Sequence, residues 1–309
     1  MKKQARQIVI AAVAAAVVLS VVGCRTSTDD LDPPGPPAPT DSFVLVEGGT
    51  FRLGEALGAW AGTNNDVTPV SNVTVSSFWM SPHLVTQGEW YDVMGDRPSF
   101  FDGTNDWGGN TVSPEFNWRN LPVERVSWRD VLAYANLLSM AAGLTPAYEI
   151  DGSTDPADWG NVGAHWDSVS IVPGSTGYRL PTEAQWEFAA KGGNEPGDYT
   201  FSGSDDPLAV AWHSANSGSR TREVGGLAAN ALGLYDMSGN VWEWVWDWWG
   251  AYTSEDKTDP TGASSGSSRV IRGGSWHFSA VHALSVFRFY DSPSSRNFLL
   301  GFRLVRPLV

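Results

Sequence analysis

Tryptophan, glycine and proline together constrain this chain more than any other sequence feature. Sixteen tryptophans occur among 309 residues, alongside 33 glycines and 19 prolines. Glycine and proline interrupt helices and strands, whereas a buried indole ring adds a large apolar surface to a core. The composition therefore predicts a loop-rich fold with little regular secondary structure, held together by large aromatic side chains.

The charge and the cysteine count exclude several classes of protein. The formal net charge is −14, which argues against binding to the phosphates of nucleic acid. Cys24 is the only cysteine, so an internal disulfide and a multi-cysteine metal site are both excluded. With 42% hydrophobic residues, the chain has enough apolar side chains to bury a core.

Residues 1–23 are typical of a lipoprotein signal peptide. A basic start precedes an apolar run over 8–22, which is short for a membrane-spanning helix. The run ends Val-Val-Gly-Cys, similar to a bacterial lipobox, which predicts cleavage before Cys24 and lipid on that cysteine. A signal anchor with an incidental cysteine is the alternative. Because Arg25 stands where an inner-membrane retention signal has aspartate, we expect an outer-membrane lipoprotein.

A tether follows the lipidation site. Residues 25–42 contain five prolines and almost no apolar side chains, so they cannot bury a core. We therefore divide the chain into a signal peptide (1–23), a lipidated proline-rich tether (24–42) and a folded domain (43–309). Cleavage removes three basic residues and leaves 17 basic against 34 acidic residues, a net charge of −17.

Short helices and strands are expected inside the folded domain. The pattern predicts a hairpin from 43–46 and 50–53, and a strand over 72–75. Three helix starts carry capping boxes, in which a hydroxyl is followed three residues later by an acid or amide: Thr86 with Glu89, Ser127 with Asp130, and Thr182 with Gln185. Glycine-rich and serine-rich stretches over 144–176 and 196–226 read as long loops. The result is a single α+β domain.

Several longer motifs follow the same order as in a known family. They are Pro122-Val-Glu-Arg-Val-Ser-Trp128, Gly177-Tyr-Arg-Leu-Pro-Thr-Glu-Ala-Gln-Trp-Glu-Phe-Ala189, Asn230 to Trp244, Arg272-Gly-Gly-Ser-Trp276 and Gly301-Phe-Arg303. Together they resemble the formylglycine-generating enzyme (sulfatase-modifying factor) family from about Phe43 to Val305. The resemblance implies that family's variant of the C-type lectin fold, which is loop-rich, with two main helices and a small antiparallel sheet.

The chemistry of that family is not expected here. Its enzymes bind copper through paired cysteines shortly after the Gly-Gly-Ser-Trp motif, whereas His277 to Ala283 contain none. Phenylalanine or alanine cannot replace a thiolate as a ligand for a soft metal. His277 and His282 do not have the spacing of the iron site in related sulfoxide synthases, and they read as two surface histidines. We therefore predict that the chain is not an enzyme.

Two further features have more than one interpretation. Asn240 and Glu243 resemble positions that hold calcium in some family members, and calcium is the one cofactor that the sequence leaves open. The alternative is that Glu243 is a buried acid that orients backbone amides among the tryptophans. The tryptophans over 242–249 could stack on a sugar, but the pattern favours core packing.

The segment over 277–300 has a composition of its own. It contains no Lys, Glu, Gln, Met or Trp, although the rest of the chain contains all five. Randomising the two adenines of an asparagine AAY codon yields residues such as Phe, Tyr, Ser, His, Asp and Leu, but never those five. This pattern resembles the variable proteins of diversity-generating retroelements, whose C-terminal lectin-fold segment is mutated in this way. With the lipobox, the chain looks like the treponemal members of that class, which are surface lipoproteins.

The resemblance implies a variable region at about 271–300, in which fixed residues alternate with variable ones. The candidate variable positions, which would contact a ligand, are His277, Phe278, Ser279, Val281, His282, Phe287, Phe289, Tyr290, Asp291, Ser292, Ser294, Ser295, Asn297, Phe298 and Leu299. The fixed residues include three glycines that permit tight turns and four arginines able to bond carbonyls and carboxylates: Gly273, Gly274, Gly301, Arg272, Arg288, Arg296 and Arg303.

Five aromatic residues in this segment predict an apolar binding patch. They are Phe278, Phe287, Phe289, Tyr290 and Phe298. The alternative is that these rings belong to the core.

We thus expect a non-enzymatic surface lipoprotein that is anchored in the membrane through Cys24. It would bind a protein or host-surface ligand, and no nucleic acid. An invariant envelope lipoprotein of the same fold, with a fixed protein-binding or sugar-binding role, is the alternative. A metal-dependent oxidase is disfavoured because it lacks the cysteines.

Overall fold

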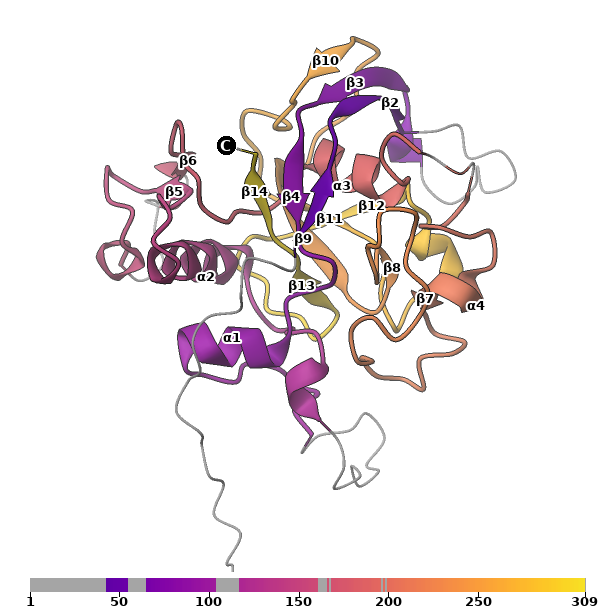
Figure 1. The fold of residues 1–309 in the computed structure, drawn as a ribbon, viewed down its shortest axis with the longest axis horizontal. Coiled ribbons are helices and arrows are strands. Elements are labelled where there is room, and N and C mark those ends of the chain that lie inside the picture. The colour runs from indigo at the N-terminus through magenta and orange to yellow at the C-terminus, as the bar shows by residue number, and fades with distance from the viewer. Residues whose placement is uncertain are drawn as a thin grey trace, which may run out of the picture. The chain divides into compact units, whose positions relative to one another are not determined.

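The computed structural model describes residues 43–54, 65–103, 117–160, 166, 168–195, 197 and 199–308. The proposed signal peptide, the lipidation site Cys24 and the tether therefore lie outside the described residues. The helices are α1 (Gln87–Met94), α2 (Trp128–Ala141), α3 (Glu183–Ala190) and α4 (Pro207–Val210), with 3-10 turns η3 (Asn65–Val67), η4 (Trp118–Asn120), η5 (Pro156–Asp158) and η7 (Ala280–Ala283) (Figure 1).

The strands are short and are distributed over several small sheets. In chain order they are β1 (Val44–Val46), β2 (Gly49–Leu53), β3 (Ser71–Val75), β4 (Phe78–Met80), β5 (Tyr148–Glu149), β6 (Ser170–Ile171), β7 (Ala211–Trp212), β8 (Ser238–Gly239), β9 (Trp242–Trp248), β10 (Lys257–Thr258), β11 (Arg269–Arg272), β12 (Arg288–Asp291), β13 (Leu300–Phe302) and β14 (Val305–Pro307). Long irregular stretches connect them, as the composition predicts.

Each of the three expected capping boxes is present. The hydroxyls of Thr86, Ser127 and Thr182 each accept a hydrogen bond from the backbone N–H three residues later. The side chain of that later residue accepts a hydrogen bond from the backbone N–H of the hydroxyl residue. Gly95 ends α1 in the left-handed conformation, with φ of 75°. The sequence therefore located the starts of α1, α2 and α3 correctly.

The predicted hairpin over 43–53 is wrong, because β1 and β2 do not pair with each other. β1 pairs with β4, and β2 pairs with β3, both antiparallel. The chain continues in one direction through Gly48, whose backbone N–H donates to Ser77 Oγ at 2.8 Å. A Cβ on Gly48 would lie 2.5 Å from the Val75 carbonyl oxygen. Gly48 therefore allows the β1–β2 stretch to approach the β3–β4 stretch closely, and it does not reverse the chain.

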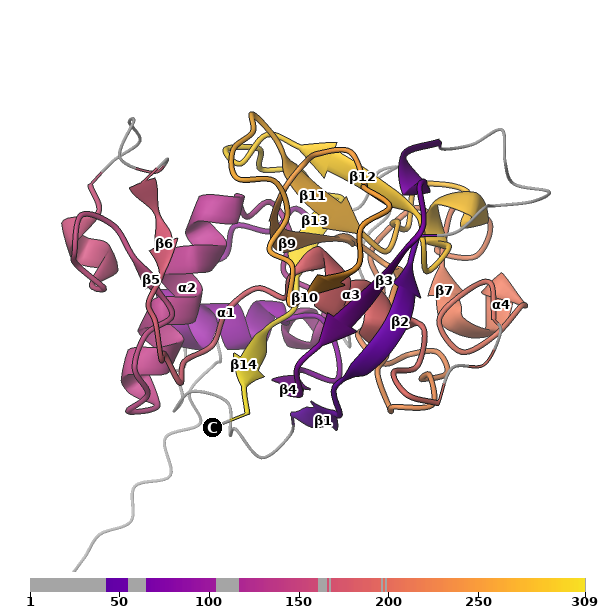
Figure 2. The same ribbon diagram turned by 90° about the horizontal axis from the view of Figure 1, so that it is seen from above.

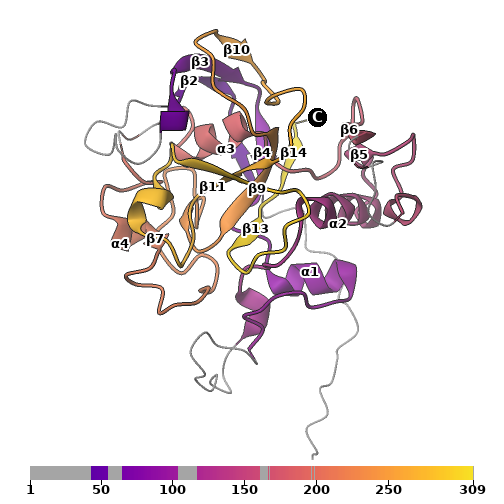
Figure 3. The ribbon, with the colours of Figure 1, turned by 180° about the vertical axis from the view of Figure 1, so that it is seen from behind.

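The central sheet has the strand order β12-β11-β9-β13. β11 is antiparallel to both β12 and β9, whereas β13 is parallel to β9, so the sheet is mixed rather than wholly antiparallel as expected. Figure 2 shows α3 between this sheet and the β2–β3 arm, and α3 contacts both. The view from behind shows β11 and β9 beside α3, with α1 and α2 on the other side of β13 (Figure 3).

Buried tryptophans tie the elements together. Trp128, Trp186, Trp244 and Trp276 are all fully buried. Trp128 Nε1 donates to the Val245 carbonyl at 2.9 Å, and Trp244 Nε1 donates to the Val126 carbonyl at 3.0 Å. These reciprocal bonds lock the start of α2 to the middle of β9. The core interpretation is thereby confirmed for Trp242 and Trp244, which lie in β9 and are buried.

Candidate functional site

Three buried arginines hold the two ends of the C-terminal segment. Arg272 ends β11 and donates to the carbonyls of Val286 and Phe287 at 2.9 and 2.7 Å. Its guanidinium also donates to Glu187. The fork of Arg272 thus fixes the backbone that leads into β12, as the sequence predicts.

Arg288 and Arg303 each clasp one buried carboxylate with two hydrogen bonds. Both bonds from Arg288 to Glu183 are 2.7 Å long. Arg303 donates to Glu243 at 2.7 and 3.0 Å. These bidentate pairs are charge-assisted and directional. We call Arg272, Arg288 and Arg303, together with Glu183, Glu187 and Glu243, the arginine frame.

Helix α3 and strand β9 supply the carboxylates of the frame. Glu183 and Glu187 lie one helical turn apart, so both project from the same side of α3. Glu243 pairs with Arg272 in the sheet and with Gly301 in β13, so it stands between the two ends of the segment. The helix start at Thr182 and the central strand therefore determine where the segment is held.

The carboxylates of the frame differ in their protonation energetics. Burial by itself would raise the pKa of Glu183, but the guanidinium groups of Arg288 and Arg272 hold it below its usual value. Burial raises the pKa of Glu243, and the single guanidinium of Arg303 opposes that rise. The difference follows from two cations near Glu183 against one near Glu243.

Glycines make the close approaches that the frame needs. Gly273 and Gly274 have φ of 91° and 75°, in the left-handed region. A Cβ on Gly274 would lie 2.7 Å from the His282 carbonyl oxygen. Gly301 lies within β13 rather than in the expected turn, and a Cβ there would come within 2.4 Å of the Val123 carbonyl oxygen.

The candidate variable positions are at the surface, with one exception. Phe289 and Tyr290 expose 46% and 44% of their area, and His277, Ser279, Ser292 and Ser294 are also exposed. The half-buried positions are Phe278, Val281, His282, Asp291, Ser295, Asn297, Phe298 and Leu299. By contrast, the arginine frame between them is buried. Surface and core residues thus alternate within one short segment.

Phe287 is the exception, and its placement on an exposed patch was wrong. Its side chain is only 3% exposed and packs against Trp242 and His282, with ring centroids 6.0 and 4.9 Å away. Phe287 directly precedes β12, and Arg272 holds its carbonyl, so its side chain is turned into the core. The alternative interpretation, core packing, is correct for this ring, and Phe278 and Phe298 are half-buried rings that also pack against the core.

Arg296 differs from the other three arginines. Its side chain is 63% exposed and contacts Asp130 at 2.7 Å. Asp130 also closes the capping box at the start of α2. Arg296 therefore links the segment to α2 from outside, and it is not a buried support.

Ring contacts connect the exposed and half-buried positions to one another through two buried tryptophans, Trp242 and Trp276. From Phe298 the contacts run through Trp276, His277 and Phe278 to Trp242, then to Phe289 and Tyr290, with each centroid separation between 5.1 and 6.1 Å. We call these seven residues the aromatic ridge: Trp242, Trp276, His277, Phe278, Phe289, Tyr290 and Phe298.

Two aromatic residues outside the C-terminal segment contact the rings at the two ends of the ridge. Phe100 lies 5.9 Å from Phe298, and Trp249 lies 4.8 Å from Tyr290. Trp249 also lies under the guanidinium of Arg288, at 4.1 Å. The sequence does not point to Phe100, and it assigns Trp249 to the tryptophans of 242–249 without a link to the C-terminal segment, because no local pattern connects either residue to that segment.

A buried acid lies beneath the Phe100 end of the ridge. Glu124 is fully buried, and its Oε1 accepts the backbone N–H of Phe101 at 2.9 Å. Burial raises the pKa of Glu124 to about 8, and the backbone N–H groups of Phe101 and Phe100 partly oppose this rise. Glu124 is therefore largely a neutral acid at pH 7.

The residues present do not fit the metals of related enzymes. Among the described residues, no group of three or more His, Cys, Asp or Glu side chains is arranged to hold a metal. Phe278 and Ala283 occupy the stretch where the enzymes have cysteines, and Ala283 is buried. No soft ligand for copper is available there.

The calcium candidates are engaged with other partners. Both carboxylate oxygens of Glu243 accept from Arg303. Asn240 Oδ1 accepts the backbone N–H of Arg222 at 3.1 Å, and its Nδ2 donates to the Arg222 carbonyl. This arrangement does not fit a bound cation, because Arg303 supplies the positive charge. Calcium binding stays a prediction for metal titration to test.

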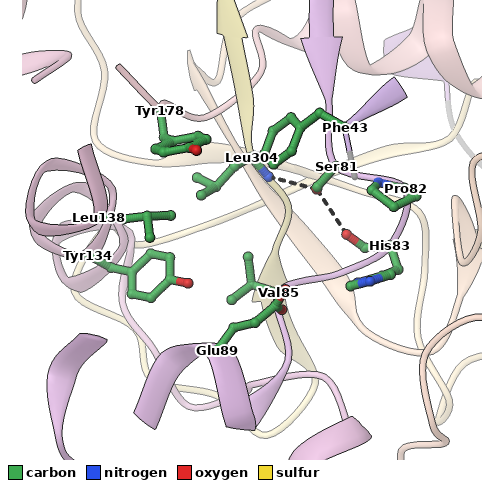
Figure 4. A pocket seen from close by; sticks show the side chains of 10 residues that line it. All are labelled: Phe43, Ser81, Pro82, His83, Val85, Glu89, Tyr134, Leu138, Tyr178 and Leu304. Carbon is green, nitrogen blue, oxygen red and sulfur yellow. Dashed lines mark hydrogen bonds between the residues drawn. The ribbon is translucent and has the colours of Figure 1, made fainter. Parts of the chain in front are cut away.

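A small cavity lies elsewhere, between α1, α2 and the segment after β4 (Figure 4). Its volume is about 30 Å³, room for about two water molecules. Ser81 Oγ lies at its rim, where it donates to the His83 carbonyl and accepts from the Leu304 backbone N–H. Neither its size nor its position connects it with the aromatic ridge.

The helices of the described residues are too short or too polar to cross a membrane.

Fold and sequence define a formylglycine-generating-enzyme-like C-type lectin domain. The chain belongs to the sulfatase-modifying factor enzyme 1-like family, whose model matches residues 30–308. The chain is 36% identical over 295 residues to chaperone protein LppX of Paenibacillus barcinonensis, covering 89% of each. It is 30% identical over 302 residues to the formylglycine-generating enzyme of Streptomyces coelicolor, covering 87% of this chain and 91% of the enzyme.

A solved structure shares both fold and sequence with this chain. Treponema denticola variable protein 1 matches with a TM-score of 0.74 and 35% identity, covering 86% of this chain and 95% of that protein. The predicted resemblance, to the enzyme family and to a treponemal variable protein, is thereby confirmed.

Proposed function

We propose that this protein is a non-enzymatic, surface-displayed lipoprotein that binds a protein ligand through the aromatic ridge and the candidate variable positions around it. One observation carries the proposal: every candidate variable position except Phe287 is at least partly exposed, while the arginine frame between them is buried. Because buried residues hold the backbone, the exposed side chains can change without altering the backbone conformation.

The chemistry of the surface supports a protein ligand. Aromatic anchors of this kind dominate the energetics of protein interfaces. Phe289 and Tyr290 are exposed in adjacent positions, and the half-buried Phe278 contacts the same Trp242 ring as Phe289. The segment contains only one acid, Asp291, in a chain of net charge −14. The ligand would therefore meet an apolar, weakly charged surface on an acidic protein.

The test of this proposal is the pattern of sequence differences between sibling strains. We expect differences concentrated at the candidate variable positions, and a genomic template repeat with asparagine codons at those sites. Differences no denser at these positions than elsewhere in 43–309, or an unchanged 277–299 segment, would rule out diversification.

Membrane attachment is tested separately. Metabolic labelling with a fatty acid should mark the wild-type chain and not a Cys24→Ala variant, because Cys24 is the only thiol. Protease added to intact cells should then remove the domain if it faces the medium.

A fixed chaperone-like role is the second candidate. It is favoured by the 36% identity to a protein named as a chaperone, over 89% of both chains. In that case the 277–299 segment would be invariant among strains, and one client protein would bind all of them. Oxidase activity is the least favoured, since Cys24 is the only cysteine.

A further inference from the structure

Arg125 has a left-handed backbone conformation and lies directly beside the C-terminal segment. Its φ is 61°, a value that costs energy for most residues other than glycine. Its backbone N–H donates to the Asn297 carbonyl oxygen at 3.1 Å, so Arg125 lies against a candidate variable position. Strained residues of this kind are concentrated at binding sites, where the surrounding structure holds them in place.

Hydrogen bonds hold the backbone on both sides of Arg125. The hydroxyl of Ser99 accepts the Glu124 backbone N–H at 3.1 Å and donates to the Glu124 carbonyl oxygen at 3.3 Å. On the other side, Trp244 Nε1 donates to the Val126 carbonyl oxygen at 3.0 Å. Because other elements fix this backbone, we expect it to keep its conformation with glycine at position 125. The arginine side chain is therefore not required by the fold.

The side chain of Arg125 is exposed, and its charge is not balanced by a partner. Within the described part of the chain it forms no hydrogen bond and no ion pair. The adjacent acid, Glu124, is largely neutral at pH 7, because burial raises its pKa to about 8. By contrast, every arginine of the arginine frame has a buried carboxylate partner.

Arg296 places a second exposed guanidinium beside the same stretch of backbone. It directly precedes Asn297, whose carbonyl oxygen accepts from Arg125, and its side chain is 63% exposed. Its partner Asp130 also accepts two hydrogen bonds in the capping box at the start of α2. Two guanidinium groups thus share one carboxylate, so this end of the ridge attracts a negative group although the chain's net charge is −14.

Building on the proposed function, we infer that Arg125 is a constant anchor of the binding surface: its guanidinium pairs with a carboxylate in an acidic segment of the protein ligand. The planar fork of arginine binds a carboxylate through two hydrogen bonds. Arg125 lies outside the region 271–300, so this contact would be the same in every variant. The acidic remainder of the chain repels a carboxylate elsewhere, so the pair also sets the orientation of the ligand.

The experiment begins with a random peptide library displayed on phage and selected in parallel against the full-length protein and its Arg125→Gly variant. Peptides selected by the wild type should be richer in Asp and Glu than those selected by the variant. Each wild-type peptide is then synthesised as the acid and with that acid replaced by its amide. The amide peptide should bind the wild type about tenfold more weakly, because a charge-assisted pair is lost. Both peptides should bind Arg125→Gly equally.

Melting temperatures separate a binding role of Arg125 from a structural one. Glycine adopts a φ of 61° without strain, so Arg125→Gly should melt at the wild-type temperature or slightly above it. Arg125→Lys keeps the charge but loses the planar fork, and it should bind the acid peptide with intermediate affinity. Arg52→Gln is the matched control: it removes an exposed arginine on β2 and should leave binding unchanged.

The outcomes separate the two proposals. If Phe289→Ala abolishes peptide binding but the acid and amide peptides bind the wild type equally, the Arg125 anchor is wrong and the proposed binding surface stands. If binding is insensitive to every substitution in 277–299, the proposed binding surface itself is wrong. A fall in the melting temperature of Arg125→Gly as large as that of a core substitution would overturn the inference. Heparin binding that is lost in Arg125→Gly, without any preference for acidic peptides, would also overturn it in favour of a sulfated glycan.

Discussion

Within the C-terminal segment, the arginines of the frame and the exposed rings of the aromatic ridge lie side by side but have opposite properties. Arg272 and Arg303 are completely buried, and each has a carboxylate partner that is also buried. Phe289 and Tyr290, one and two residues after the buried Arg288, are nearly half exposed. In β12, therefore, one residue (Arg288) holds the backbone in place, and its neighbours Phe289 and Tyr290 form the exposed surface.

The frame uses directional pairs where a core would ordinarily use apolar contacts. Buried ion pairs add little net stability compared with apolar residues, but removing one partner leaves an uncompensated charge. Arg272 and Arg303 therefore determine where the backbone lies. A segment whose exposed side chains change needs this kind of support, because contacts made by those side chains would not be the same in every variant.

The largest expected effect comes from breaking one pair of the frame. Arg303→Ala should lower the free energy of unfolding by about 3–5 kcal/mol, because Glu243 is left buried without its partner. Urea denaturation at pH 7 measures the loss. Arg296→Ala is the control, and its exposed pair with Asp130 should be worth about 0–1 kcal/mol. Equal losses in the two variants would remove the distinction between frame and surface arginines.

The next largest expected effect is a difference in stability between alanine variants of two phenylalanines, Phe287 and Phe289, which are two residues apart. Phe287→Ala should cost about 3 kcal/mol, because it leaves a cavity against Trp242. Phe289→Ala should cost less than about 1 kcal/mol, since almost half of the ring is already in water. Thermal unfolding of both variants tests this. If Phe289→Ala were the more damaging variant, the ridge would have to be counted as core.

A smaller effect depends on pH. The pKa of Glu124 is about 8 in the folded chain against an ordinary value of 4.5, so the folded state binds the proton more tightly than the unfolded state. Stability should therefore fall as pH rises from about 5 to about 8 and level off above that. Asp247, whose pKa burial raises to about 7, contributes in the same direction.

Glu124→Gln isolates the contribution of Glu124. The amide still accepts from Phe101 but does not ionise, so at pH 8 the variant should be more stable than the wild type, by an amount on the order of a few kcal/mol. The two proteins should converge near pH 5. Parallel curves of unfolding free energy against pH would show that Glu124 does not titrate in this range.

The smallest effects are expected at the exposed candidate positions. Ser279→Tyr and Ser294→Leu place residues reachable from an AAY codon at exposed sites, and each should change the unfolding free energy by less than about 0.5 kcal/mol. Ligand selection, by contrast, should change. A loss of several kcal/mol in either variant would mean that the segment does not tolerate diversification.

Much of the local structure was predictable because its causes are local. A hydroxyl at Thr86, Ser127 or Thr182 satisfies backbone donors only a few residues away, so the start of each helix can be read from the sequence. The hairpin prediction was wrong for the converse reason. The partner of β1 is β4, some 30 residues further on, and a local turn pattern carries no information about it.

The sequence by itself determined the family, the loop-rich architecture, the helix starts and the identity of the arginines that support the C-terminal segment. Only the tertiary structure decided that Arg296 is exposed, that Phe287 is core, and that Phe100 and Trp249 support the ridge. Neighbouring residues point to opposite sides of a strand, so burial depends on which elements cover each side. In this protein those elements come from distant parts of the chain: α3, β9 and the segment around Phe100.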